Sequence, residues 1–206
     1  AGLLELARVL KGLPTRRTVR LVFFNVEEPG IIGATSYFNS IRAKVQTETP
    51  SDQFPLEPGK EHLVGMVSLE MLGYYSERPG SQKSPIRNVP GVIEQPDRGT
   101  FIALTTTQRG SPFARRLDAE MRAGSPELET FVFDLLPIPI PDLLRSDHRP
   151  FMLAGIPAIM LTDTANFRNP HYHQPTDMIE TIDPVRFTRV VRGLAAAAYA
   201  IAEPAK

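Results

Sequence analysis

Cysteine is absent from the 206 residues, and neither charge predominates. Without cysteine there is no disulfide, no thiolate metal site and no thiol nucleophile, so any metal must be held by His, Asp and Glu. Lys plus Arg equals Asp plus Glu, at 23 each, which leaves no basic footprint for nucleic acid. No apolar run approaches the ~20 residues that span a bilayer. The length fits one domain, and an apolar fraction of 42% supports a folded core.

The chain is organised around an apolar run that ends in two carboxylates. The run within 18–26 predicts a central strand buried on both faces, followed by Glu27 and Glu28. Pro29 cannot extend that strand, and Gly30 permits a turn that would let both acids face one cleft. The acids would then lie at the carboxyl end of a buried strand, where open α/β sheets bind ligands. The plainer alternative is a pair of solvated acids at a strand end.

The rest of the chain alternates between helical and strand patterns. Caps are expected from Ser111 and Asp183, each followed by a proline at the first helical position. Helices are predicted at 2–12, 33–44, 112–123, within 147–155 and from 184 onward, and strands at 18–26, 62–72, 101–105, 129–133 and 156–161. This alternation predicts a single domain over 1–206, an α/β sandwich with a mixed, largely parallel sheet.

Polar side chains collect after the predicted strands. Glu70 ends the strand at 62–72, Asp147 and His148 precede a short helix, and His173 lies in a loop after the last strand. Carboxylates and imidazoles without cysteine suit zinc or another divalent metal. One acid would ligate the metal while its neighbour takes the proton of the activated water. Each residue also has a plainer interpretation: Glu70 as an acid facing water, His148 as a capping group, and His173 as an ordinary loop residue.

Four segments, taken together and in this order, resemble a known family. They are Asn25-Val-Glu-Glu-Pro-Gly-Ile-Ile-Gly33, Leu69-Glu-Met-Leu-Gly-Tyr-Tyr75, Ser146-Asp-His-Arg-Pro-Phe151 and Tyr172-His-Gln-Pro-Thr-Asp177. The chain is similar over nearly its whole length to the co-catalytic zinc exopeptidases related to bacterial leucyl aminopeptidase and aminopeptidase Y. Glutaminyl cyclases are relatives of that family. The resemblance implies a phosphorylase/hydrolase-like fold, a three-layer α/β/α sandwich around the mixed sheet.

The resemblance also implies roles for individual residues. Glu27 matches the general base, Glu28 and His173 match zinc ligands, and Glu70 matches the acid, commonly Asp, that binds the other zinc. The resemblance implies that Asp147 and His148 orient these ligands without binding the metal themselves. We therefore expect Glu27, Glu28, Glu70 and His173 to converge on one cleft at the carboxyl edge of the sheet. The ligand atoms of Glu28, Glu70 and His173 should lie roughly 4–5 Å apart.

One departure from the family lies at the start of the chain. The family places a His-x-Asp segment and an Asp-Asn segment, which supply a ligand and a bridging Asp, before the helix that opens this sequence. We therefore expect the N-terminal strands and two ligand positions to be missing. The chain would hold one zinc or none instead of the family's two. An unpaired sheet edge would favour self-association.

The resulting hypothesis is a metallo-aminopeptidase domain that hydrolyses N-terminal peptide bonds of a peptide substrate with zinc-activated water. One alternative is a degenerate, non-catalytic domain that serves as a scaffold or binding module. A second is a glutaminyl-cyclase-like acyltransferase, in which Glu27 would again shuttle a proton. The resemblance favours a secreted or periplasmic location.

Overall fold

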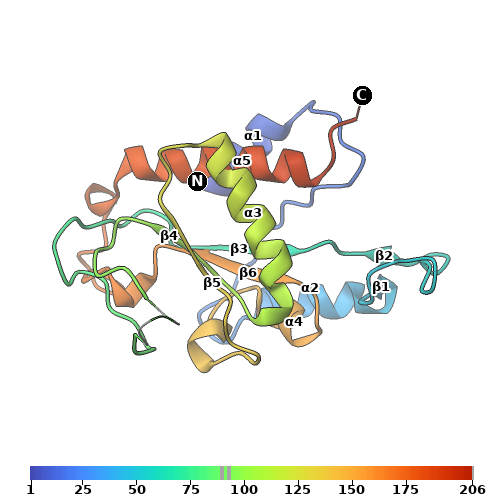
Figure 1. The fold of residues 1–206 in the computed structure, drawn as a ribbon, viewed down its shortest axis with the longest axis horizontal. Coiled ribbons are helices and arrows are strands. Elements are labelled where there is room, and N and C mark those ends of the chain that lie inside the picture. Colours follow the sequence, from blue (N-terminus) through green and yellow to red (C-terminus); the bar gives the residue numbers. More distant parts are fainter. Residues whose placement is uncertain (89–90, 92–93, 206) are drawn as a thin grey trace.

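The computed structural model describes residues 1–88, 91 and 94–205. A four-stranded sheet is covered by helices on both faces (Figure 1). The helices are α1 (Gly2–Leu10), α2 (Ile32–Ile41), α3 (Ser111–Gly124), α4 (Arg149–Leu153) and α5 (Pro184–Ile201). The strands are β1 (Val45–Gln46), β2 (Glu61–His62), β3 (Met66–Glu70), β4 (Ile102–Thr105), β5 (Thr130–Phe133) and β6 (Ala158–Thr162). Among the described residues, none of the helices combines the length and apolarity needed to cross a membrane.

The sheet is mixed and mostly parallel, as predicted. Its strand order is β3-β6-β4-β5, in which β3 pairs with β6 and β4 with β5 in parallel, while β4 and β6 are antiparallel. β1 and β2 form a separate two-stranded pair. The predicted strands at 62–72, 101–105, 129–133 and 156–161 appear as β3, β4, β5 and β6, each shorter than predicted. The sandwich of three layers is therefore confirmed.

Two apolar cores flank the sheet. The larger lies between the sheet and the layer of α1, α3 and α5, with fully buried Leu104, Ile159 and Val190 among its members. The smaller lies under α2 and α4 and is built around Phe38 and Phe151, whose ring centroids are 5.0 Å apart. Burial on both faces explains why β4 and β6 are almost continuously apolar.

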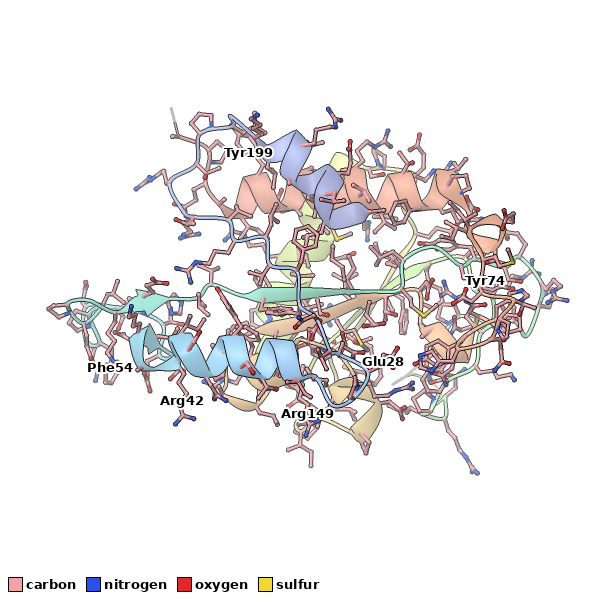
Figure 2. The ribbon with its side chains drawn as sticks, turned by 180° about the vertical axis from the view of Figure 1, so that it is seen from behind. Glu28, Arg42, Phe54, Tyr74, Arg149 and Tyr199 are labelled. Atoms are coloured by element: carbon pink, nitrogen blue, oxygen red, sulfur yellow. The ribbon has the colours of Figure 1, made fainter. Side chains whose placement is uncertain are left out.

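The prediction of a central, buried strand at 18–26 is wrong for the described residues. This segment is extended, but it pairs with no strand among them. Phe23 is 61% exposed and Val26 is 46% exposed, whereas a central strand would bury both. A β-strand requires a neighbouring strand that forms hydrogen bonds with its backbone N–H and C=O groups. An apolar sequence by itself does not provide such a neighbour. Instead the segment runs as a coil from α1 to the turn at Glu27 (Figure 2).

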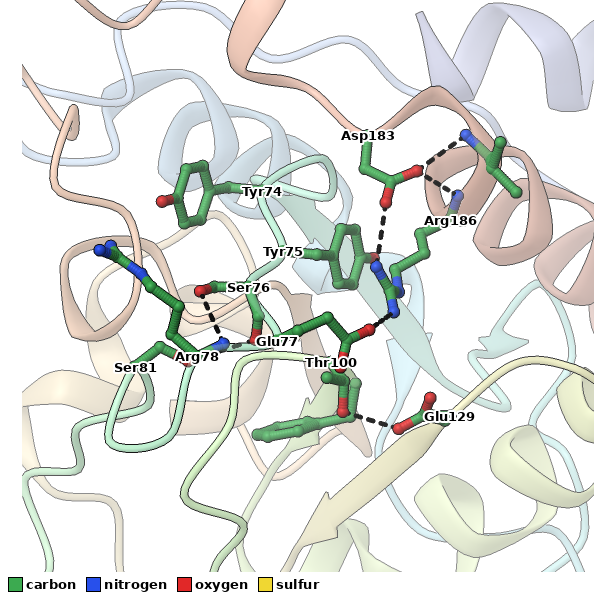
Figure 3. Close-up of polar contacts among 12 residues, drawn as sticks. Tyr74, Tyr75, Ser76, Glu77, Arg78, Ser81, Thr100, Glu129, Asp183 and Arg186 are labelled. Atoms are coloured by element: carbon green, nitrogen blue, oxygen red, sulfur yellow. Dashed lines mark hydrogen bonds and ion pairs between the residues drawn. The ribbon is translucent and has the colours of Figure 1, made fainter.

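The two predicted helix caps have different outcomes. Asp183 caps α5, because its Oδ1 accepts from the amides of Val185 at 3.0 Å and Arg186 at 2.9 Å. Arg186 pairs in turn with Asp183 and with Glu77 (Figure 3). Ser111 is not a cap.

The Ser111 hydroxyl donates to Oδ2 of the buried Asp134 at 2.5 Å instead. Gly110 occupies the cap position of α3 without a side-chain bond. A buried carboxylate is a stronger hydrogen-bond acceptor than water. The Ser111 hydroxyl therefore bonds to Asp134 and does not cap α3.

Candidate active site

Glu27 and Glu28 lie in a tight turn between the extended segment and α2. The carbonyl of Glu27 accepts from the amides of Gly30 at 3.0 Å and Ile31 at 2.6 Å. Val26, immediately before the acids, has a φ of 55°, which β-branched residues rarely adopt. Both acids line one cavity, an arrangement that consecutive residues of a straight strand do not reach.

His173 lies directly against Glu28. The Nε2 atom of the imidazole is 2.9 Å from Oε1 of the carboxylate. His173 has a φ of 55°, a backbone conformation that persists only where its surroundings hold it. Its ring stacks on Tyr172 with centroids 3.9 Å apart. Arg145 donates from Nη2 to the Tyr172 hydroxyl at 3.1 Å, and this clamp keeps the imidazole beside Glu28.

Glu70 ends β3 and lines the same cavity. Its Oε2 accepts from the hydroxyl of the buried Ser146 at 2.8 Å, and Ser146 is 2.8 Å from the hydroxyl of Ser68. Sequence reasoning gave neither serine a role. The signal was present for Ser68, because it stands two residues before Glu70 and strand residues at that spacing share a face. The two serines fix the orientation of the Glu70 carboxylate.

Asp147 lies near the acidic side chains of the site, whereas His148 bonds to the loop around Leu143. Asp147 is close enough for its charge to raise the pKa of both Glu27 and Glu70, and its Oδ1 is buried without a partner among the described residues. His148 is fully buried and donates from Nε2 to the carbonyl of Leu143 at 2.6 Å. It therefore holds the loop around Leu143, and within the described part of the chain no hydrogen bond joins it to a predicted ligand. Support of a metal by these two residues stays a prediction.

The environment of Glu27 suits proton transfer. Burial raises the pKa of Glu27 to about 7, and the nearby charges of Glu70 and Glu28 add to the rise. Burial also raises the pKa of Glu70, against the hydrogen bond from Ser146, which lowers it. A carboxyl that titrates near neutral pH can both accept and return a proton under physiological conditions.

The residues fit a metal ion only in part. Zinc bonds of about 2.0–2.2 Å in tetrahedral geometry place two ligand atoms about 3.3 Å apart. The 2.9 Å between Glu28 and His173 is close to that spacing, and an acid and an imidazole are suitable donors. Glu70 shares the cavity with them, yet the described part of the chain contains no group of three ligating side chains. Glu28 and His173 therefore lie at ligating distance from each other, and among the residues that the structure describes no group of three ligating side chains includes Glu70.

The cavity beside these acids has a volume of about 750 Å³. Its wall on the sheet is largely apolar, because alternate residues of β4, β5 and β6 face it. The apolar side chains from these strands are Ala103, Phe131, Phe133 and Met160. A polar reacting group and an apolar side chain of the same ligand therefore both have a place in the cavity.

Comparison with known proteins identifies the family. The sequence profile of peptidase family M28 matches residues 1–198. The chain is 34% identical to the Escherichia coli "Uncharacterized protein YfbL", covering 97% of this chain and 56% of that protein. It is 25% identical to "Aminopeptidase YwaD" of Bacillus subtilis, covering 96% of this chain and 35% of that protein. The chain thus spans about half or less of the length of these curated relatives.

Two solved structures share the fold. The Legionella pneumophila LapA aminopeptidase superposes with a TM-score of 0.66 at 15% identity, over 100% of this chain and 46% of that chain. BSAP, a zinc aminopeptidase from Bacillus subtilis, gives a TM-score of 0.64 at 21% identity, over 100% of this chain and 41% of that chain. At these identities the likeness shows the fold alone, while the profile match covers nearly the whole sequence. The chain belongs to peptidase family M28.

Proposed function

We propose that this protein is a zinc-dependent aminopeptidase that removes an N-terminal residue from peptides. The main evidence is that one cavity is lined by four residues from three separate parts of the chain, namely Glu27, Glu28, Glu70 and His173. Membership of family M28 and the similarity to a protein named as an aminopeptidase support the proposal. The roles of the four residues follow from the family resemblance and from their surroundings.

In this proposal Glu28 and His173 would hold one zinc ion, and Glu70 would hold the other, as the family resemblance implies. Bound zinc would supply a Lewis acid. Glu27 accepts a proton from the attacking water and returns it to the leaving amine, for which a pKa of about 7 is well placed. The apolar wall of the cavity receives the side chain of the substrate's first residue. Ser146 and Ser68 hold Glu70, while Tyr172 holds His173 beside Glu28.

A specific observation favours the non-catalytic alternative for residues 1–206 taken alone. The described residues supply only the Glu28–His173 pair at ligating distance, and no third donor joins it. Such a site would bind zinc weakly, since two protein ligands leave most of the coordination sphere open. The proposed activity is therefore an activity of the complete gene product.

Two substitutions in the complete gene product test the division of labour. Glu27→Gln keeps the shape of the side chain but cannot accept a proton, so turnover of an aminoacyl chromogenic substrate should be lost while zinc content is retained. Glu28→Gln should lose zinc as well as turnover. Glu57→Gln, at an exposed position away from the cavity, is the control and should change neither. Zinc is measured by elemental analysis of the purified variants.

Equal zinc loss in Glu27→Gln and Glu28→Gln would contradict the assigned roles. If the complete gene product binds zinc but cleaves no aminoacyl substrate, the proposed metal site would be supported and the aminopeptidase proposal would be refuted. Failure to hold zinc at all would support the non-catalytic alternative.

A further inference from the structure

One side of the active-site cavity is built from two segments that are distant in the sequence. Residues 82–86 belong to the long loop after β3, residues 164–167 follow β6, and every residue of both segments lines the cavity. The amide of Lys83 donates to the carbonyl of Phe167 at 2.8 Å, so the two segments are bonded to each other. We call the two segments together the loop wall. Its apolar members include Ile86 and Phe167, which can contact an apolar part of a ligand.

The side chain of Gln82 joins the two segments of the loop wall. Its Nε2 donates to Oγ1 of Thr164 at 3.0 Å, and its Oε1 accepts from Nε of Arg168 at 2.9 Å. The backbone amide of Gln82 donates to the carbonyl of Asp97 at 3.0 Å, which ties it to the other end of its own loop. Gln82 thus lines the cavity and is held from behind by Arg168.

Arg168 is a cation in the interior of the protein. It is 6% exposed, and burial lowers its pKa to about 10, so the guanidinium stays charged at neutral pH. Its Nη1 donates to the carbonyls of Phe101 at 2.8 Å and Tyr74 at 3.3 Å, and its guanidinium carbon lies 4.6 Å from the centre of the Phe101 ring. A buried charge is costly unless it is hydrogen-bonded, and the planar fork of arginine donates in fixed directions. Arg168 therefore holds these two carbonyls and the Gln82 side chain in one arrangement.

The backbone beside Arg168 is shaped to this arrangement. A Cβ at Gly99 would lie 2.6 Å from Cδ of Arg168, so the loop passes this close only because residue 99 is glycine. Thr164 and Ala165 have φ values of 76° and 47°, a left-handed conformation that non-glycine residues rarely adopt. The buried Asp163 supports it by accepting from the amide of Ala165 at 3.0 Å. Such a conformation persists only where its surroundings hold it, so the position of the loop wall is fixed by its contacts.

We propose that Gln82 and Arg168 are positioning residues for substrate binding. Arg168, acting through Gln82, holds the loop wall where it contacts the side chain of the substrate's first residue. This role rests on the proposed aminopeptidase function: a large apolar first side chain reaches Ile86 and Phe167, whereas the methyl group of alanine stops short of them. Release of the loop wall therefore weakens the binding of large first residues and leaves the binding of small ones unchanged.

The alternative role for the same contacts is a brace that supports the fold and does not affect binding. Gln82→Met separates the two roles, because methionine resembles glutamine in length and volume but cannot form the hydrogen bonds to Thr164 and Arg168. Gln82→Glu keeps an oxygen that accepts from Arg168 and is the conservative variant. Gln53→Met, at an exposed loop position, is the matched control. Gln82 is only half-buried, so its variants should fold.

Steady-state kinetics of the complete gene product test the role in binding, with leucyl and alanyl p-nitroanilides as substrates. In Gln82→Met the ratio of the leucyl KM to the alanyl KM should rise about tenfold over wild type, as expected for a lost apolar contact in a binding pocket. The kcat values should stay within about twofold, because this contact is equally strong in the ground state and the transition state. Zinc content should not change, and Gln82→Glu and Gln53→Met should keep the wild-type KM ratio. An unchanged ratio in Gln82→Met, or an equal rise in Gln82→Glu, would overturn the proposal.

Hydrogen exchange of the same proteins, resolved to single amides, provides a readout that needs no turnover. The amide of Lys83, which bonds to Phe167, should exchange at least about tenfold faster in Gln82→Met than in wild type, while amides of β4 exchange at the wild-type rate. Gln82→Glu and Gln53→Met should match wild type. Equal exchange of the Lys83 amide in all of these proteins would overturn the proposal even if the wild type is an active aminopeptidase. A wild type that cleaves neither substrate would refute the aminopeptidase proposal and with it the role in substrate binding, whatever the exchange of Lys83.

Discussion

Protonation of His148 should destabilise the fold by an amount that urea unfolding can measure. The imidazole is fully buried, and its Nε2 donates to the carbonyl of Leu143, which leaves Nδ1 without a partner among the described residues. A proton on Nδ1 would bring a charge and an unpaired N–H into the interior. Burial accordingly lowers the pKa of His148 to about 4, from an ordinary value of 6.5.

The sign of the effect follows from this lowered pKa. Between about 4 and 6.5 the unfolded chain binds more protons than the folded chain, so stability falls as the pH drops. The contribution is fully present above about pH 6.5. At about 1.4 kcal/mol per pKa unit, its total is about 3 kcal/mol, of which about 2 kcal/mol is lost by pH 5. That loss is a sizeable part of the stability of an ordinary domain.

The assay compares variants, because other groups titrate in the same range. Burial raises the pKa of Glu27 and of Glu70, and raised carboxyl pKa values act in the opposite direction. Urea unfolding followed by circular dichroism gives the free energy of unfolding near neutral pH and near pH 5 for wild type and His148→Gln. The glutamine keeps a donor but does not titrate, so the variant should lose about 2 kcal/mol less than wild type. Equal losses would refute the reasoning, and His62→Gln, at a half-exposed histidine, should behave like wild type.

Two further predictions concern a helix cap and the histidine clamp. Asp183→Ala should lower the free energy of unfolding by about 1 kcal/mol because α5 loses its cap, and Asp183→Asn should keep most of it; equal stability of the two variants in urea would contradict the capping role. Tyr172→Ala should weaken zinc binding by the complete gene product about tenfold because it releases the ring of His173. Tyr172→Phe retains the aromatic stack and should bind zinc nearly as well as wild type in calorimetric titrations. A similar loss of zinc affinity in both variants would show that stacking does not position the imidazole.

Local features of the structure could be predicted from the sequence, because the interactions that form them join residues close together in the chain. Asp183 caps α5 through amides two and three residues away, and the helix follows from its apolar period. The turn after Val26 was indicated by Pro29 and Gly30. The sequence also indicated that Glu27 and Glu70 would share a cleft, because the carboxyl ends of parallel segments meet at one edge of a sheet.

Other features depended on partners that are distant in the sequence. The run at 18–26 has the composition of a buried strand, but strand formation and burial require a ladder, and no described segment provides one. The orientation of Glu70 depends on Ser146, 76 residues away, and His173 meets Glu28 across 145 residues. Ser111 has the character of a cap, yet it bonds to the buried Asp134. Propensity and periodicity act over a few residues, whereas hydrogen-bond partners, burial and pKa are properties of neighbours in space, which only the tertiary structure brings together.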